Sequence, residues 1–169
     1  HAESGLALVS YVDPSGRLRV DRVFRRGRNL VLGTTLIEPG STPGCRSGGG
    51  LEIGPDGTLY VGVGDLEDPG SAQDDARLGG KLLRVNLDGS IPSDNPNPTS
   101  FVFAKGVRDT ADLALNASSA RTNGTVYAND LGAAGSAADE INAVVPGGNH
   151  GWDSLSGDSG GLFDDPLVA

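Results

Sequence analysis

Acidic side chains gather in two neighbouring segments of this chain, where they could hold a cation or orient a base. The first segment is Asp65–Asp68, directly after an apolar run, and Asp74 and Asp75 follow it. Carboxylate oxygens are the ligands that calcium favours, so a calcium-binding loop is one interpretation of this cluster. The spacing does not fit an EF-hand, and a solvated loop closed by turns is the alternative.

Groups that could transfer a proton are scarce. The chain has two histidines, His1 at its start and His150 in the run Asn149–Trp152. An imidazole changes its charge near neutral pH, which makes His150 a candidate base. Its setting favours a structural loop histidine beside a packed tryptophan. The single cysteine, Cys45, excludes a disulfide framework within the chain.

Short strand signals recur along the chain and would position these groups. Apolar runs are separated about every ten residues by turn-forming Gly, Pro and Asp, and no amphipathic helix interrupts them. This pattern predicts an all-β fold, either a sandwich, a barrel or a propeller. The expected strands are Gly5–Val12, Arg17–Phe24, Asn29–Ile37 (closed by Pro39 and Gly40), Gly50–Ile53, Thr58–Val63, Lys81–Leu87, Phe101–Val107, Asp112–Leu115, Thr125–Ala128 and Glu140–Val145.

Two stretches of the sequence resemble each other. Gly54–Val61 reads GPDGTLYV and Thr122–Ala128 reads TNGTVYA, so that each has Asp or Asn, then Gly, Thr, an apolar residue and Tyr. A repeat separated by about seventy residues favours a propeller. Residues 1–169 contain no obvious linker and are treated as one domain. We expect residues 154–163, which are rich in Gly, Ser and Asp, to form a flexible segment.

The charge of the chain limits its partners. The chain has 13 Lys and Arg residues and 22 Asp and Glu residues, which gives a net charge of −9. An acidic surface argues against binding to nucleic acid or to anionic lipid, and it is compatible with cation binding or with simple solubility. No apolar run is long enough to span a membrane. Because the chain has no Met and no signal peptide, we expect a processed or truncated product.

Six motifs occur in a fixed order along most of the chain. They are Gly48–Asp65 (GGGLEIGPDGTLYVGVGD), Ala72–Asp74 (AQD), Leu78–Pro96 (LGGKLLRVNLDGSIPSDNP), Gly106–Arg108 (GVR), Ala138–Asn142 (ADEIN) and Pro146–Trp152 (PGGNHGW). With these motifs the chain resembles the soluble quinoprotein sugar dehydrogenases, the glucose/sorbosone dehydrogenase family. No single motif is decisive, but their order is specific.

The resemblance implies a six-bladed β-propeller, of which this chain would supply about half of the blades. It also implies an exported protein, periplasmic or extracellular, that binds pyrroloquinoline quinone (PQQ) and calcium and oxidises sugars at the propeller mouth. Half a propeller leaves open sheet edges. We therefore expect a partner: the remaining blades, a second copy or another subunit.

The family's general base is a His two positions before a Gly-Gly pair, and here that position holds Arg46. Arginine stays protonated and cannot accept the proton of a sugar hydroxyl. The carboxylate that orients the base in the family corresponds to Asp65. Arg46 is therefore expected either to form an ion pair with Asp65 or to be a solvated loop arginine.

The resemblance also assigns cofactor residues. Gln73 and Arg108 would line the quinone site, but the Asn expected after Arg108 is Asp109, a negative charge facing an anionic cofactor. The H-G-P element that should supply carbonyl ligands to the cofactor calcium is not recognisable in residues 129–135. Asp139 and Glu140 match an Asp-Glu pair that binds a structural calcium in the family.

These departures suggest a divergent propeller that has lost the catalytic base and acts as a secreted binding or structural module, with a sugar or glycan as a candidate ligand. The alternative is an active PQQ-dependent aldose dehydrogenase of which this is a fragment. An interaction domain that binds protein or glycan through its loops is a third interpretation.

Overall fold

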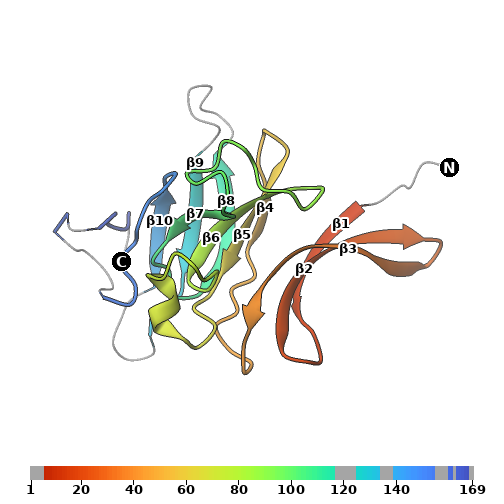
Figure 1. The fold of residues 1–169 in the computed structure, drawn as a ribbon, viewed down its shortest axis with the longest axis horizontal. Coiled ribbons are helices and arrows are strands. Elements are labelled where there is room, and N and C mark those ends of the chain that lie inside the picture. The colour runs from red at the N-terminus through yellow and green to blue at the C-terminus, as the bar shows by residue number, and fades with distance from the viewer. Residues whose placement is uncertain (1–5, 117–124, 134–138, 155–159, 162, 168–169) are drawn as a thin grey trace.

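A computed structural model describes residues 6–116, 125–133, 139–154, 160–161 and 163–167. Three antiparallel sheets follow one another along the chain (Figure 1). The N-terminal sheet contains β1 (Leu6–Val12), β2 (Arg17–Arg26) and β3 (Asn29–Ser41); the central sheet contains β4 (Leu51–Ile53), β5 (Thr58–Val63), β6 (Lys81–Asn86) and β7 (Val102–Lys105); the C-terminal sheet contains β8 (Thr110–Asn116), β9 (Thr125–Asp130) and β10 (Glu140–Val144). This arrangement confirms the all-β prediction.

Helix is confined, in the described residues, to one 3-10 turn, Pro69–Ala72, in the loop between β5 and β6. No helix in this part of the chain has the length and apolar character needed to cross a membrane. Residues 155–159 and 162 lie outside the described residues, so the predicted flexibility of residues 154–163 stays a prediction.

Beta3 is longer than expected. The sequence predicts a strand that Pro39 and Gly40 close, but β3 continues to Ser41. Leu18 pairs with Gly40 and Val20 pairs with Ile37, so β3 carries an extra residue between these pairs. Pro39 falls within this bulge, where the ladder does not require the N–H that proline lacks.

The central sheet is buried on both faces, and it divides the interior into two cores. All six residues of β5 are buried. Leu59, Val61 and Val63 face the N-terminal sheet, whereas Tyr60 faces the C-terminal sheet. This period of two is the alternation of side chains along a strand. Each outer sheet therefore packs on its own face of the central sheet.

The two similar sequence stretches occupy similar places. Beta5 lies inside the central sheet, between β4 and β6, and β9 lies inside the C-terminal sheet, between β8 and β10. These two sheets are adjacent and packed together, so each unit of the repeat corresponds to one sheet. The expected strand Phe101–Val107 is shorter in the structure and ends at Lys105, because Gly106 turns the chain with φ +79°.

Candidate functional site

Two backbone segments cross closely at the end of β5. A Cβ atom on Gly64 would lie 2.0 Å from the carbonyl oxygen of Arg46, and one on Gly48 would lie 2.4 Å from that of Gly62. Only glycine allows this approach. The Leu66 N–H also donates to the Arg46 carbonyl over 3.1 Å. The crossing brings the Arg46 position next to Asp65.

Arg46 and Asp65 form an ion pair. The Arg46 Nε lies 2.7 Å from Asp65 Oδ1, and the Asp65 side chain is fully buried while 25% of the Arg46 side chain is exposed. The Nε is itself buried and lacks an aligned hydrogen bond within the described residues. Of the two alternatives, the structure contains the ion pair and not the solvated arginine.

The backbone around this pair adopts left-handed conformations that favour glycine. Arg46 has φ +48°, Leu66 has φ +56° and Glu67 has φ +64°. Such conformations cost about 1–3 kcal/mol each in residues other than glycine and cluster at functional sites. Their concentration on both sides of Asp65 makes this crossing the best candidate site.

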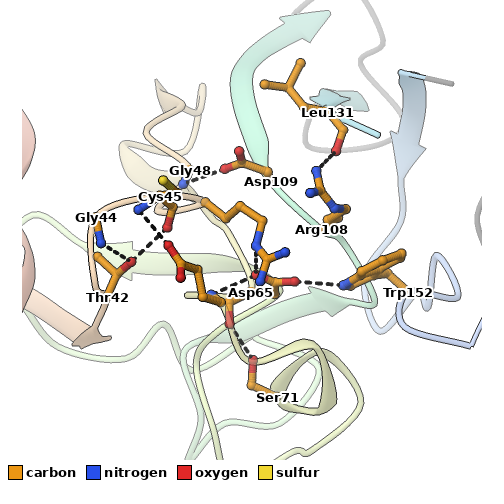
Figure 2. Close-up of polar contacts among 12 residues, drawn as sticks. Thr42, Gly44, Cys45, Gly48, Asp65, Ser71, Arg108, Asp109, Leu131 and Trp152 are labelled. Atoms are coloured by element: carbon orange, nitrogen blue, oxygen red, sulfur yellow. Dashed lines mark hydrogen bonds and ion pairs between the residues drawn. The ribbon is translucent and has the colours of Figure 1, made fainter. Parts of the chain in front are cut away.

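Asp65 has further hydrogen-bond donors. The Glu67 N–H donates to Oδ1 over 2.9 Å, and the indole N–H of Trp152 donates to Oδ2 over 3.0 Å. Figure 2 shows the side chains of Asp65 and Trp152 pointing toward each other. Both carboxylate oxygens are thus occupied by contacts within the protein.

Three of the predicted site residues converge on Trp152. Asp65 accepts its indole N–H. The Arg108 guanidinium lies over its ring, 5.6 Å from the centroid. The Gln73 amide donates to its carbonyl oxygen and exchanges hydrogen bonds with Asn149. Trp152 therefore links residues from the β5–β6 loop and the loop after β7.

Arg108 and Asp109 are held by contacts within the protein. The Arg108 guanidinium donates to the carbonyls of Leu131 and Gly132, at 2.9 and 2.8 Å. Asp109 Oδ1 accepts the Gly48 N–H over 2.9 Å. This oxygen therefore holds the backbone crossing together, and the expected place of Asp109 beside the cofactor stays a prediction.

Asp130 anchors the same loop, and sequence reasoning missed it. Its carboxylate accepts the backbone N–H groups of Arg108 (2.8 Å) and Asp109 (2.6 Å). Burial raises the pKa of Asp130 to about 6, and its neighbours Glu140 and Asp109 add to the increase. Asp130 lies within residues 129–135, where the family's H-G-P element was expected, but no motif there indicated its two N–H partners.

Lys81 fixes the loop that carries Gln73. It is fully buried, and its Nζ donates to the carbonyls of Ser71, Ala72 and Gly79. Burial lowers the pKa of Lys81 to about 8. The motif Leu78–Pro96 included this lysine, but nothing in the sequence indicated its three carbonyl partners.

A cleft of about 390 Å³ lies beside the buried carboxylate. It opens between the end of β3 and the β5–β6 loop. Its lining includes Gly40, Asp65, Asp68, Ser71 and Arg77. The Arg77 guanidinium pairs with the Asp68 carboxylate, so charged and hydroxyl groups border the cleft. Such a polar cleft suits a small hydrogen-bonding ligand.

The residues predicted to bind calcium do not form a carboxylate cluster. Asp139 is exposed and accepts the Gly132 N–H at 3.0 Å, whereas Glu140 is buried opposite Asp130 in the strand register. In the described part of the chain no three His, Cys, Asp or Glu residues are placed to hold a metal ion. The calcium site stays a prediction.

The described residues do not fit an anionic quinone. The two guanidinium groups, Arg46 and Arg108, are bound to protein oxygens. Two further carboxylates besides Asp65 lie near them, because Glu67 accepts the Cys45 N–H and Asp109 accepts the Gly48 N–H. An anion would meet a surplus of negative charge here.

Comparison with known proteins identifies the family to which this chain is related. The model of the glucose/sorbosone dehydrogenase family matches residues 23–160. Quinoprotein glucose dehydrogenase B of Acinetobacter calcoaceticus is 36% identical over 131 residues, covering 64% of this chain and 26% of that protein. Aldose sugar dehydrogenase YliI of Escherichia coli is 32% identical over 119 residues, covering 68% and 30%.

A solved structure shows the same fold. The PQQ-bound form of aldose sugar dehydrogenase from Streptomyces coelicolor superposes with a TM-score of 0.87 at 30% identity, over 99% of this chain and 49% of that one. The three sheets are thus blades of a sugar dehydrogenase propeller. The chain spans about half the length of this structure and less of the curated relatives. It belongs to the glucose/sorbosone dehydrogenase family.

Proposed function

We propose that this chain is a propeller module that binds a ligand without oxidising it. The observation that carries the proposal is the ion pair between Arg46 and Asp65, with 2.7 Å between Nε and Oδ1. The guanidinium keeps its proton at physiological pH and cannot serve as a base. The guanidinium also forms an ion pair with the Asp65 carboxylate, the group that would orient a histidine base.

A sugar or glycan is the proposed ligand. The cleft beside Asp65 offers carboxylate and guanidinium groups from Asp68 and Arg77. These groups can donate to and accept from the hydroxyls of a neutral sugar. The named relatives are glucose and aldose sugar dehydrogenases, which supports a carbohydrate as the ligand class.

The test is aldose turnover by the native polypeptide with added PQQ and calcium, together with calorimetric titration of the same sugars. We expect sugar binding and no turnover. Asp68→Ala should weaken binding, whereas Asp88→Ala, on an exposed turn outside the cleft, should leave it unchanged. Turnover that Asp65→Ala abolishes would refute the proposal.

An active dehydrogenase is the second candidate. Its support is the convergence of Gln73, Asp65 and Arg108 on Trp152, since three of the family's site positions remain together. In that case PQQ should bind, which a shift in its absorbance would report. Arg46→His should then raise turnover, because it restores a base beside Asp65.

Calcium, location and partners complete the proposal. We infer that Asp139 and Glu140 contribute to a calcium site together with backbone carbonyls, and that the protein acts outside the cytoplasm, as the family resemblance implies. Further blades, from the same polypeptide or from another chain, would cover the outer faces of the stacked sheets.

A further inference from the structure

Two buried polar side chains lack protein partners for some of their atoms. Asn142 on β10 is fully buried, and neither its amide oxygen Oδ1 nor its amide nitrogen Nδ2 has a hydrogen-bond partner in the described part of the chain. His150, which follows β10, is 6% exposed, and its Nε2 is also without a partner there. Buried polar atoms are normally hydrogen-bonded, because leaving one unpaired is costly. These three atoms therefore point to a bound molecule.

Both side chains belong to the interior between β10 and β7. Asn142 lies two residues before Val144 on the inner face of β10, and Val144 packs in the same core as Ala104 of β7 (Figure 1). His150 is fastened to β7, because its N–H donates over 2.9 Å to the carbonyl of Lys105, the last residue of that strand. The unpartnered atoms thus lie between two sheets that both belong to this chain.

A second contact holds the His150 ring beside β10. Its Nδ1 lies 3.2 Å from the carbonyl oxygen of Asp164, and the same segment is bonded to β10, since the Leu167 N–H donates to the Ile141 carbonyl over 2.8 Å. A carbonyl can only accept, so Nδ1 carries the proton and Nε2 is an acceptor. Burial lowers the pKa of His150, against the opposing effects of the Asp164 carbonyl and the Glu140 carboxylate, and keeps the ring neutral at pH 7.

The unpartnered atoms include both a donor and acceptors. Nδ2 of Asn142 donates, whereas Oδ1 of Asn142 and Nε2 of His150 accept. A metal ion would use only the acceptors and be repelled by the amide hydrogens, and an anion would be repelled by the acceptors. Water donates and accepts, so it suits all three atoms. The residue opposite Asn142 in the strand register is the small Ala128, which leaves room beside the amide.

We propose that Asn142 and His150 bind at least one buried water molecule between β10 and β7. The water joins the inner face of the C-terminal sheet to the segment that carries Trp152, two residues after His150. Trp152 in turn donates to Asp65 over 3.0 Å. Asn142 is thus a positioning residue that acts on the candidate site through the water and this segment. The water site depends neither on a sugar in the cleft nor on calcium.

A crystal structure of the native polypeptide, grown with EDTA, tests the site without any substitution. We expect a water oxygen about 2.7–3.2 Å from the Asn142 amide, and Nε2 of His150 bonded to that water or to one next to it. A direct hydrogen bond between the two side chains, or dry space around the amide, would overturn the proposal. A metal ion at this position in crystals grown with calcium, identified by its anomalous signal, would also overturn it.

Two substitutions should remove the water. Asn142→Leu replaces the amide by an apolar group of similar size, and His150→Phe removes the Nε2 acceptor. In each folded variant, oxygen-17 relaxation dispersion should count at least one long-lived internal water fewer than in the wild type. Asn129→Leu, at an exposed amide on the opposite face of the same sheet, is the matched control and should keep the wild-type count. A wild-type count in either of the first two variants would refute the site.

Hydrogen exchange tests the positioning role. The Trp152 N–H donates to the Gly106 carbonyl over 2.9 Å, and in Asn142→Leu its exchange should become at least about fivefold faster. Asn142→Ser keeps a hydroxyl and leaves room for a further water, so it should retain most of the protection. Wild-type exchange of this amide in Asn142→Leu, with an unchanged circular dichroism spectrum, would reject the positioning role.

Discussion

The indole N–H of Trp152 donates to Oδ2 of Asp65 over 3.0 Å, although 87 residues separate them in the sequence. Asp65 follows β5 in the central sheet, whereas Trp152 lies beyond the last strand of the C-terminal sheet. The candidate site is therefore a product of tertiary structure. Changes at either residue should affect both the stability of the fold and the site.

Asp65→Asn should lower the free energy of unfolding by about 2–4 kcal/mol, because it leaves the partly buried Arg46 without its counter-charge and gives Trp152 a weaker acceptor. Urea denaturation measures the change. Asp68→Asn is the matched control, since it removes an exposed ion pair with Arg77 and should cost less than about 1 kcal/mol. Equal effects would contradict a special role for Asp65.

Gly64→Ala should prevent the backbone crossing, because its Cβ would lie 2.0 Å from the Arg46 carbonyl oxygen. We expect a loss of more than about 3 kcal/mol, in the range of severe overpacking. Gly57→Ala meets no atom within 4 Å and has φ +77°, so it should cost only about 1–2 kcal/mol. Thermal unfolding of the two variants compares these costs, and similar melting temperatures would be the contrary result.

Local pattern was sufficient to predict the fold class and most of the strands. The strand Thr58–Val63 and the turn at Gly54–Gly57 follow from short-range rules, and the structure has both. The bulge at Pro39 could not be predicted, since it depends on the pairing of β3 with β2. Strand pairing joins segments that are distant in the sequence.

The site was predictable in part. Family motifs identified Asp65, Gln73 and Arg108, which the structure links through Trp152. The anchoring carboxylate of Asp130 was missed, because its role depends on backbone N–H groups 21 and 22 residues away. Hydrogen bonds between a side chain and a distant backbone have no sequence signature.

Asp130 should make stability depend on pH. Its folded pKa of about 6 lies above the ordinary value of 3.8, so the folded state binds its proton more tightly than the unfolded state. This contribution to the free energy of unfolding is full below about pH 4 and is lost as the pH rises through 6, a change of about 3 kcal/mol.

The variant Asp130→Asn should remove that part of the pH profile. It should also cost about 1–3 kcal/mol at low pH, since the amide NH2 that replaces one of the two oxygens would face the N–H of Arg108 or Asp109. Urea denaturation at a series of pH values gives the difference between the two profiles. Asp112→Asn, at an exposed carboxylate, should keep the wild-type profile; parallel curves for Asp130→Asn would disprove the assignment.

Lys81→Met should loosen the loop that carries Gln73, because the carbonyls of Ser71, Ala72 and Gly79 lose their common donor. We expect a cost of at least about 2 kcal/mol and faster amide hydrogen exchange across residues 69–79. Lys105→Met, which removes a partly exposed partner of Asp75, should leave exchange in this loop unchanged. Unaltered hydrogen exchange in Lys81→Met would show that the loop does not depend on Lys81 for its stability.

The division of the interior into two cores has a consequence for folding. The core around Leu59 and the core around Tyr60 share no buried residue, and each sheet comes from one continuous stretch of chain. Contacts between sheets therefore join neighbours in the chain, as in repeat proteins, where structure can begin in one unit and spread to the next. Unfolding should proceed in steps, so that damage to the C-terminal sheet leaves the pairing of the first two sheets in place.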